Sequence, residues 1–191
     1  MNWLEYLDQE VLLTINRGHL PWLDTFFWYV SKSWFPLGFY ALTFILLIKQ
    51  YRPKRALLFL GIILVNLALT DIISTQIFKE GVKRYRPSHH LVLGPQLHLY
   101  EESPGVYYKG GQYGFFSSHA ANYSGFFFFV LALLWDTEKK WMISLGCLGI
   151  LICYSRIYLG VHYPSDILAG ILFGGMVGWT AQWFAKKFMN P

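Results

Sequence analysis

The sequence contains little cysteine and little charge. Its two cysteines, Cys147 and Cys153, lie within one apolar run. Thiols in such a position are usually small buried hydrophobes, so we expect neither a disulfide framework nor a thiolate metal site. Only 14% of the residues are charged, whereas 54% are hydrophobic and 19% are aromatic. With a mean hydropathy of +0.34, this composition excludes an ordinary water-soluble protein and indicates an integral membrane protein.

Other protein classes also lack support. The formal net charge is +5, but no basic stripe with interleaved aromatic residues lies outside the apolar segments. We therefore expect no nucleic-acid partner, and membrane-flanking charges that face anionic lipid instead. No linker, low-complexity tract or solenoid repeat divides the sequence, so residues 1–191 are expected to form a single domain. The amino terminus has neither the basic start nor the cleavage site of a signal peptide.

Long apolar runs predict an all-α integral membrane bundle. A bilayer core of roughly 30 Å requires about 20 apolar residues in a helix. Four runs meet this requirement approximately: Leu57–Phe78, Phe115–Trp135, Trp141–Tyr154 with its flanks, and Ile167–Phe184. A fifth region, Trp22–Ile48, is interrupted by Ser-Lys-Ser-Trp-Phe-Pro, so it forms one kinked helix or two shorter helices, and we predict five or six helices. In the last run, Gly170, Gly174 and Gly178 predict close helix packing within the fold.

The amino-terminal segment has the periodicity of an amphipathic helix. Its apolar face consists of Trp3, Leu4, Leu7, Val11 and Ile15. The opposite, polar face consists of Glu5, Asp8, Gln9 and Glu10. A helix with two such faces is typical of segments that lie at the bilayer surface, so we predict an interfacial helix here.

Loops rich in lysine and arginine predict the orientation of the bundle, because short loops of this kind stay in the cytoplasm. Three segments are assigned to the inside: Lys49–Arg55, Asp136–Lys140, and the pair Lys186 and Lys187. Segment 79–116 and the stretch Ser155–Asp166 then lie together outside. That side also receives several cations: Lys79, Lys83, Arg84, Arg86, Lys109 and Arg156. Cations are unusual on the outer side, so we infer that an anionic ligand binds there.

Three clusters on the outer side carry groups suited to a phosphate: Lys79–Pro87, Phe115–Ala120 and Ser155–Asp166. Lysine offers a point charge and arginine a planar fork for phosphate oxygens. Ser117 and Ser118 precede an apolar run, where hydroxyls and backbone N–H groups at a helix start complete an anion cradle. Histidines supply a nucleophile and a general acid. His162 and Asp166 are four residues apart, so a helical turn after the intervening proline allows the carboxylate to hold the imidazole.

The order and spacing of these residues resemble a three-part signature. Its parts are Lys79, six residues and Arg86-Pro87; then Ser117-Ser118-His119; then Ser155-Arg156, five residues, His162, three residues and Asp166. The pattern resembles the phosphatidic acid phosphatase type 2 superfamily, which contains membrane lipid phosphatases and soluble vanadium-dependent haloperoxidases. The first and third parts match in full. In the second, Phe116 and Ser118 stand where proline and glycine are usual, so the backbone N–H is kept but a Cβ is added beside the ligand.

The resemblance implies phosphate-binding roles for five residues. Lys79, Arg86 and Arg156 would hold the phosphate oxygens and neutralise charge in the transition state. Ser117 and the backbone N–H of Ser118 would add hydrogen bonds. Taken singly, the cations have another explanation, because lysine and arginine also anchor helix ends at lipid headgroups.

The resemblance also implies catalytic roles for three residues. His162 would attack phosphorus to form a phosphohistidine, Asp166 would orient His162, and His119 would protonate the departing oxygen and later activate water. Singly, Asp166 could cap a helix and His119 could be a core histidine. Their joint order on one side of the membrane favours the catalytic interpretation. No metal or other cofactor is implied, and the outer side has no carboxylate cluster suited to magnesium.

The polar segment from Ser88 to Gly114 is too polar to span the bilayer. We expect it to lie over or beside the site at the outer interface and to shape the choice of headgroup. It contains His89, His90 and His98, with no cysteine or ordered carboxylates at ligand spacing. We therefore interpret these histidines as loop-surface residues rather than metal ligands.

We therefore expect a membrane phosphatase that removes a terminal phosphate from a lipid at the outer edge of the bilayer. The absence of an added domain resembles bacterial members of the family, which predicts a bacterial inner membrane and a site facing the periplasm. The candidate substrates are undecaprenyl diphosphate, the phosphates of lipid A, and phosphatidylglycerol phosphate. A phosphotransferase and a non-catalytic lipid-phosphate binder or transporter stay open, whereas a haloperoxidase is disfavoured because those relatives are soluble. The sequence gives no indication of oligomeric state.

Overall fold

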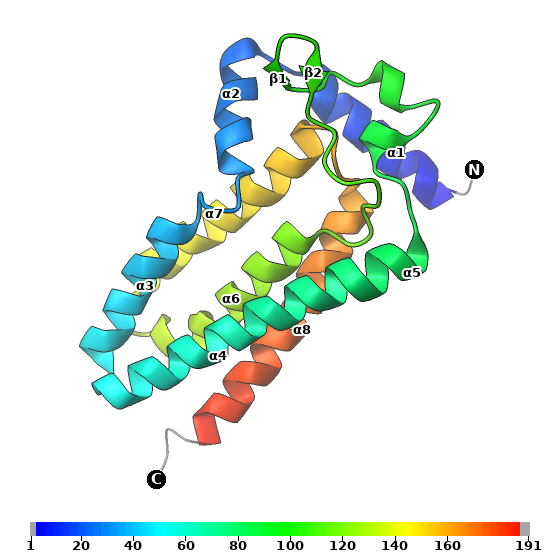
Figure 1. The fold of residues 1–191 in the computed structure, drawn as a ribbon. Coiled ribbons are helices and arrows are strands. Elements are labelled where there is room, and N and C mark those ends of the chain that lie inside the picture. Colours follow the sequence, from blue (N-terminus) through cyan, green and yellow to red (C-terminus); the bar gives the residue numbers. More distant parts are fainter. Residues whose placement is uncertain (1–2, 188–191) are drawn as a thin grey trace.

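A computed structural model describes residues 3–187, and nearly all of its regular structure is helical (Figure 1). The long helices are α1 (Trp3–Arg17), α2 (Pro21–Val30), α3 (Leu37–Gln50), α4 (Pro53–Ile72), α6 (Ser118–Leu134), α7 (Lys139–Tyr158) and α8 (Pro164–Lys187). The short elements are the π-helix η1 (Ile73–Lys79), α5 (Glu80–Val82), the 3-10 turns η2 (Pro87–His89) and η3 (Gly94–Gln96), and the antiparallel strands β1 (Glu101–Ser103) and β2 (Val106–Tyr107). The predicted all-α class is confirmed. Counting α1, seven long helices in the described range slightly exceed the expected five or six.

Three helices are long and apolar enough to cross a membrane. They are the continuous helix Pro53–Val82, which joins α4, η1 and α5, together with α7 and α8. α3 and α6 are also apolar but shorter. Only 28% of the apolar window of Pro53–Val82 is buried inside the protein. Most of its apolar side chains therefore face outward, as a helix in contact with lipid requires.

The apolar region Trp22–Ile48 divides into two helices. α2 ends at Val30 and α3 begins at Leu37, and residues 31–36 between them form turns. Pro36 lacks a backbone N–H, so an uninterrupted helix through this point would lose a hydrogen bond and crowd its preceding turn. Of the two forms that the sequence left open, the pair of shorter helices is present.

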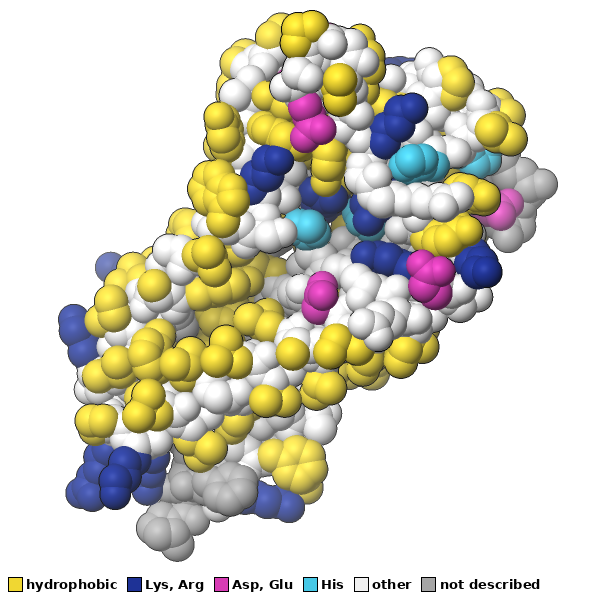
Figure 2. Space-filling view, viewed as in Figure 1, with side chains coloured by type: hydrophobic (Ala, Val, Ile, Leu, Met, Phe, Trp, Pro, Cys, Tyr) yellow, Lys and Arg dark blue, Asp and Glu magenta, His cyan; other side chains and the backbone are white. Residues whose placement is uncertain are grey.

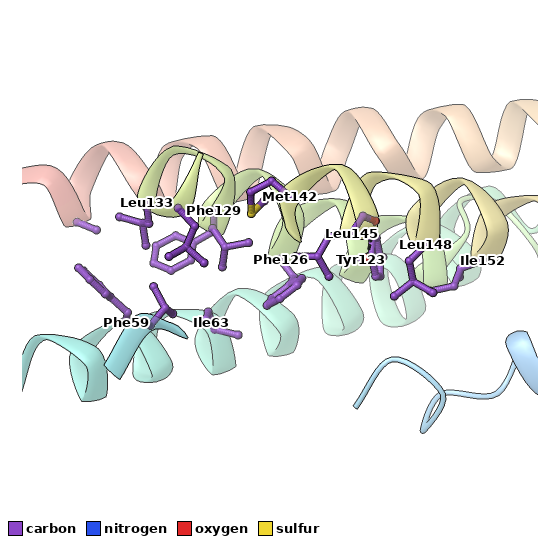
Figure 3. Close-up of a cluster of buried hydrophobic side chains, with 14 of the residues drawn as sticks. Phe59, Ile63, Tyr123, Phe126, Phe129, Leu133, Met142, Leu145, Leu148 and Ile152 are labelled. Carbon is purple, nitrogen blue, oxygen red and sulfur yellow. Dashed lines mark hydrogen bonds between the residues drawn. The ribbon is translucent and has the colours of Figure 1, made fainter. Parts of the chain in front are cut away.

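α6 lies at the centre of the bundle and packs against α4, α7 and α8. Figure 3 shows the apolar cluster that joins α4, α6 and α7. Its labelled members are Phe59, Ile63, Tyr123, Phe126, Phe129, Leu133, Met142, Leu145, Leu148 and Ile152. Because lipid chains are as apolar as these side chains, close packing rather than exclusion of water holds the helices together.

Three glycines allow α8 to lie directly against α6. A Cβ added at Gly170, Gly174 or Gly178 would lie 2.6, 2.0 or 2.2 Å, respectively, from a backbone oxygen of α6 or of its N-cap. Any larger residue would push the two helices apart, so the predicted close packing is confirmed. The seam also brings the two helix starts together, since the backbone N–H of Ser117 donates to the carbonyl oxygen of Asp166 at 3.1 Å.

α1 buries a different face from the predicted one. Trp3 is 75% exposed and Val11 is also exposed, whereas Asp8 is buried. The prediction that Asp8 lies on the outward polar face is therefore wrong. Asp8 turns inward because it forms an ion pair with Arg84 at 2.7 Å and accepts a hydrogen bond from the backbone N–H of Ser165 at 2.9 Å. The exposed side of α1 carries Trp3, Leu4, Tyr6 and Val11 together with Glu5 and Glu10, a mixture that suits the bilayer surface.

The two ends of the bundle differ chemically. At the loop end, α1 and α2 gather with segment 83–117 and the connection 159–163 (Figure 1). At the opposite, basic end, the helix ends carry Lys49, Arg52, Lys54, Arg55, Lys139, Lys140, Lys186 and Lys187. Figure 2 shows dark-blue side chains grouped at this end. These are the cations from which the sequence predicted a cytoplasmic side.

Candidate active site

The three motif clusters meet at the loop end. Lys79 ends η1, Arg86 follows α5 in extended backbone, Arg156 lies in the last turn of α7, and His162 lies between α7 and α8. His119 lies at the start of α6. Figure 2 shows histidine and cationic side chains gathered in a hollow between the loop end and the membrane helices. The fold therefore assembles residues that are far apart in the sequence.

His162 is oriented by groups on both ring nitrogens. Its side chain is 1% exposed, and Nε2 lies 3.0 Å from Nη1 of Arg86. A guanidinium only donates, so Nε2 accepts and the ring proton resides on Nδ1. That nitrogen lies 3.4 Å from Oδ2 of the buried Asp166, close enough for electrostatic attraction but too long for a good hydrogen bond. The lone pair on Nε2 therefore faces the cationic side of the site.

The surroundings of His162 keep its imidazole neutral. Burial lowers its pKa well below the usual value, and the charges of Arg86, Arg156 and Lys79 lower it further. Burial, followed by the charge of Arg156, also lowers the pKa of Arg86 to about 10, so its guanidinium stays charged at neutral pH. A neutral imidazole beside charged cations is suited to attack an electrophile that carries negative charge.

Three cations at the site have no carboxylate partner. Within residues 3–187, no ion pair joins Lys79, Arg86 or Arg156 to an aspartate or glutamate. Arg86 donates instead to the backbone oxygen of Tyr113 at 3.1 Å, and the buried Arg156 donates to the hydroxyl of Tyr108 at 3.0 Å. Buried cations without counter-charges are costly, so the site is complementary to an anion. Both tyrosines belong to segment 88–114, which confirms that this segment lies against the site.

Lys79 is positioned by serines from two helices. Its Nζ donates to Oγ of Ser118 at 2.7 Å, and the same oxygen accepts from the hydroxyl of Ser74 at 2.8 Å. Ser74 and Lys79 both lie on η1, whose wider turn changes which side chains face α6. The hydroxyl of Ser118, at the position where the family usually has glycine, therefore holds the lysine beside the helix start.

Ser117 is the N-cap of α6. Its Oγ accepts a hydrogen bond from the backbone N–H of Ala120 at 3.4 Å. Cap geometry leaves the remaining N–H groups of the first turn available to an anion, and the helix dipole adds partial positive charge. The predicted role of Ser118 through its backbone N–H is compatible with this position. Ser117 itself is fully buried and is oriented by its cap contact.

His119 lines a pocket of 260 Å³ between the α2–α3 connection, α4 and α6. Its Nε2 is buried and has no hydrogen-bond partner among residues 3–187, so the hydrogen-bonding capacity of this nitrogen is unused. The wall is mixed: Tyr40 and Leu67 are apolar, whereas Lys32 and Asp71 carry charge. A molecule with a charged head and an apolar chain fits such a wall.

A second charged network supports Asp166 and was missed from the sequence. Nη1 of Arg84 donates to Oδ1 of Asp166 at 2.7 Å, while Nη2 contacts Asp8 at 2.7 Å. Burial acts to lower the pKa of Arg84, but the two carboxylates outweigh it and raise that pKa above its usual value. Ser165 completes the network by hydrogen bonding to Asp8 and Arg84. The presence of Arg84 among the outward cations was the one available signal, and nothing local indicated its partners.

The cations without carboxylate partners and the partly apolar pocket wall suit a molecule with an anionic head and an apolar chain. A membrane protein with such a site belongs to the class that acts on lipid phosphates. Comparison with protein families agrees. The family model described as the PAP2 superfamily matches residues 55–189, and the chain belongs to this superfamily. It is a lipid phosphatase, a hydrolase that acts on phosphoric esters of lipids.

Two relatives and one solved structure illustrate the likeness. The chain is 34% identical to the lipid A 4'-phosphatase of Porphyromonas gingivalis over 180 residues, which cover 93% of this chain and 72% of the relative. It is 29% identical to the undecaprenyl-diphosphatase of Sulfolobus acidocaldarius over 90% of this chain and 75% of that relative. The transmembrane PAP2 type phosphatidylglycerolphosphate phosphatase of Bacillus subtilis shares the fold, with a TM-score of 0.71, 20% identity, and coverage of 100% of this chain and 90% of that one.

Proposed function

We propose that this enzyme removes a terminal phosphate from an envelope lipid through a phosphohistidine intermediate, at the periplasmic face of a bacterial inner membrane. One observation carries the proposal: the buried His162 presents Nε2 to a group of cations that have no carboxylate partner in the described chain. A phosphate bound by Lys79, Arg86 and Arg156 would bring phosphorus next to that nitrogen. The cations at the basic end support the orientation, because such residues favour the cytoplasmic side.

In the first step, Nε2 of His162 attacks phosphorus while the bond from phosphorus to the lipid oxygen breaks. Asp166 stabilises the positive charge that develops on the ring, because it lies beside Nδ1. His119 donates a proton to the departing oxygen, so the dephosphorylated lipid leaves as a neutral hydroxyl or as a lipid monophosphate. The cations and the start of α6 stabilise the charge on the transferring phosphoryl group.

In the second step, His119 accepts a proton from water as the water oxygen attacks the phosphohistidine. The bond from phosphorus to nitrogen breaks, inorganic phosphate is released, and His162 returns to its neutral form. We propose that no metal ion takes part, because the three cations already supply the positive charge that a metal would provide. Turnover in the presence of EDTA is the expected result, and loss of turnover restored by magnesium would contradict this part of the proposal.

Lipid A phosphate is the substrate that we favour among the three envelope lipids. Two relatives named lipid A 4'-phosphatase align with 93% and 98% of this chain, at 34% and 32% identity. A pocket of 1010 Å³ at the loop end, lined by Ser88, His89 and Lys109 among others, offers room for a sugar headgroup. Ser88, which lines this pocket, lies two residues after Arg86 in the chain.

A substrate panel tests the proposal directly. Purified protein in detergent is assayed for inorganic phosphate with lipid A, undecaprenyl diphosphate, phosphatidylglycerol phosphate and a short-chain phosphatidic acid. We expect the highest kcat/KM for lipid A and no release by His162→Ala. Efficient hydrolysis of another lipid, with lipid A left intact, would overturn the substrate assignment but leave the phosphohistidine chemistry standing.

The two alternatives predict different results in the same assay. A phosphotransferase would release phosphate only when a second lipid or sugar acceptor is added, so strict dependence on an acceptor would contradict the hydrolase. A non-catalytic binder or transporter would retain lipid transport after His162→Ala and His119→Ala. Trapping of labelled phosphate on wild-type protein, but not on His162→Ala, would favour either enzyme over the binder.

A further inference from the structure

Two histidines and an aspartate meet at the loop end, outside the candidate active site. His19 follows α1, Asp24 lies in the first turn of α2, and His98 lies between η3 and β1. Nε2 of His98 is 2.8 Å from Oδ2 of Asp24, and the rings of His98 and His19 stack with centroids 3.6 Å apart. One potential ligand atom from each residue lies within 4.8 Å of the other two. His98 lies in a loop with its side chain 38% exposed, as predicted, but its ring also contacts Asp24 and His19.

The cluster is supported by buried groups. The side chain of Asn16 accepts from the backbone N–H of His98 and donates to its carbonyl oxygen, both at 2.8 Å. The hydroxyl of Tyr158 donates to Oδ1 of Asp24 at 2.6 Å, which leaves Oδ2 for another partner. Outer contacts of this kind fix the orientation of ligands in metal sites. The backbone of His98 and the carboxylate of Asp24 are thus held before any ion arrives.

We propose that His19, Asp24 and His98 form a binding site for a divalent transition metal, with Zn²⁺ the best match. Two imidazoles and one carboxylate are ligands that zinc accepts at about 2.0–2.2 Å, so the ligand atoms need to approach one another by small side-chain rotations. The exposed His19 can turn out of its stacked position to direct a ring nitrogen at the ion. On binding, Nε2 of His98 would coordinate the ion in place of its contact with Oδ2 of Asp24, and the hydrogen of the neutral ring would lie on Nδ1.

The site is incomplete with three protein ligands, and its position indicates what completes it. Asp24 and His98 also line the pocket of 1010 Å³ at the loop end. A tetrahedral ion held by three side chains would therefore direct its open position at this pocket, where water or an oxygen of a bound headgroup can bind. Its protein ligands would join the end of α1, α2 and segment 88–114, whose Tyr108 contacts Arg156.

Two neighbouring histidines provide matched controls. Nε2 of His89 lies 3.3 Å from the backbone oxygen of Gly110, and Nδ1 of His90 accepts from backbone N–H groups of Val92 and Leu93. Both belong to the same segment as His98 but not to the cluster. Their replacement therefore removes a histidine from this surface without removing a proposed ligand.

Zinc binding by the purified protein tests the proposal. Protein stripped with EDTA and transferred to chelator-free detergent is incubated with Zn²⁺ and desalted, and zinc per chain and Tm are measured. We expect one zinc per chain and a higher Tm for wild type, His89→Ala and His90→Ala. His19→Ala, Asp24→Asn and His98→Ala should each bind zinc at least about tenfold more weakly.

His19→Ala keeps the test decisive even if the other two variants fold poorly, because the exposed His19 side chain can be removed with little effect on packing. No zinc on the wild type, or equal zinc on His19→Ala and the two control variants, would overturn the metal site. Phosphate release is measured on the same stripped protein. If the zinc-free protein still releases phosphate, the metal site is separate from catalysis. If His162→Ala binds zinc but releases no phosphate, the two proposals are tested independently, because the enzyme has failed while the metal site is intact.

Discussion

Arg84 and Arg86 are separated by one residue, yet their surroundings are opposite. Arg84 contacts two carboxylates, Asp8 and Asp166, each at 2.7 Å. Arg86 has no carboxylate partner among residues 3–187 and lies against His162 instead. A buried cation whose charge is balanced by its neighbours holds structure together, whereas an unbalanced one is complementary to a ligand. The comparison therefore separates a supporting arginine, Arg84, from Arg86, which we propose to bind phosphate.

The two halves of this comparison meet at Asp166. One carboxylate oxygen binds Arg84, and the other faces His162 and accepts from the backbone N–H of Tyr163 at 3.1 Å. Arg84 thus fixes the carboxylate that in turn orients the proposed nucleophile. Asp8 binds Nη2 of the same guanidinium, so α1 contributes to the support of Asp166 although none of its residues touches the pocket of His119.

Loss of the proposed nucleophile should have the largest effect. His162→Ala removes the atom that would bond to phosphorus, so we expect kcat/KM to fall by at least ~10⁴-fold, as for other residues that act as a catalytic unit. Phosphate release from the preferred lipid measures this change. Cys147→Ala, a change at an exposed side chain that lines neither of the two pockets described, is the control and should keep normal turnover. Activity of His162→Ala within tenfold of the wild type would refute the phosphohistidine.

Breaking the balanced network should mainly reduce stability. Arg84→Met leaves Asp8 and Asp166 buried without their partner, which should lower the free energy of unfolding by about 3–5 kcal/mol. Unfolding in detergent, followed by circular dichroism, measures the loss. Adding Asp8→Asn to Arg84→Met should recover part of it, because one unpaired charge is then removed. If Arg84→Met is as stable as the wild type, the proposal that Arg84 is structural whereas Arg86 serves the ligand is contradicted.

Removing one of the three cations without carboxylate partners should lower activity but not stability, the reverse of the effect of Arg84→Met. Arg86→Met, Arg156→Met or Lys79→Met should each cost about 3 kcal/mol of transition-state stabilisation, or on the order of 100-fold in kcat/KM. Tm should stay constant or rise, because each change relieves repulsion among like charges. Near-normal turnover in all three variants would exclude the phosphate assignment, and a large loss of Tm would show that these cations are structural.

The pH profile should show the smallest effect. Since burial and nearby cations lower the pKa of His162 below its usual value of 6.5, the imidazole stays neutral as the pH falls through 6.5. The acid limb of kcat/KM should therefore lie below pH 6.5. Lys79→Met removes one of these charges, so its acid limb should move to higher pH. An acid limb at or above pH 6.5 in the wild type would contradict the described surroundings of His162.

Sequence patterns predicted the residues of the candidate site better than the ion-pair network of Asp8 and Arg84 that supports Asp166. Lys79, Arg86 and His162 are marked by fixed spacings within short segments, and short segments can be interpreted without a fold. The pairing of Asp8 with Arg84 spans 76 residues and follows no periodicity. The helical pattern of α1 instead directed Asp8 outward, because amphipathic periodicity assumes that water lies on the polar side. Here Asp8 meets Arg84, whose side chain is 26% exposed.

In the fold, too, some features could be predicted from the sequence and others could not. Apolar runs predicted most of the long helices, and Pro36 marked the break between α2 and α3 without deciding between a kink and two helices. The π-helical turn η1 had no signal, since one extra residue in a turn leaves the hydrophobic pattern almost unchanged. It nevertheless determines how Lys79 meets Ser118.

The glycine seam between α6 and α8 sets the distance between the starts of these two helices. Gly170 is not a motif residue, yet a Cβ there would press on the backbone oxygen of Ser117 at 2.6 Å and on Ala120 at 3.0 Å. The helix starts that carry His119 and Asp166 can lie this close only because residue 170 has no side chain. Methyl-sized changes in this buried seam would therefore alter the distance between the proposed proton donor His119 and Asp166, which we propose to orient the nucleophile. Selectivity could then evolve at this seam while every charged group stays the same.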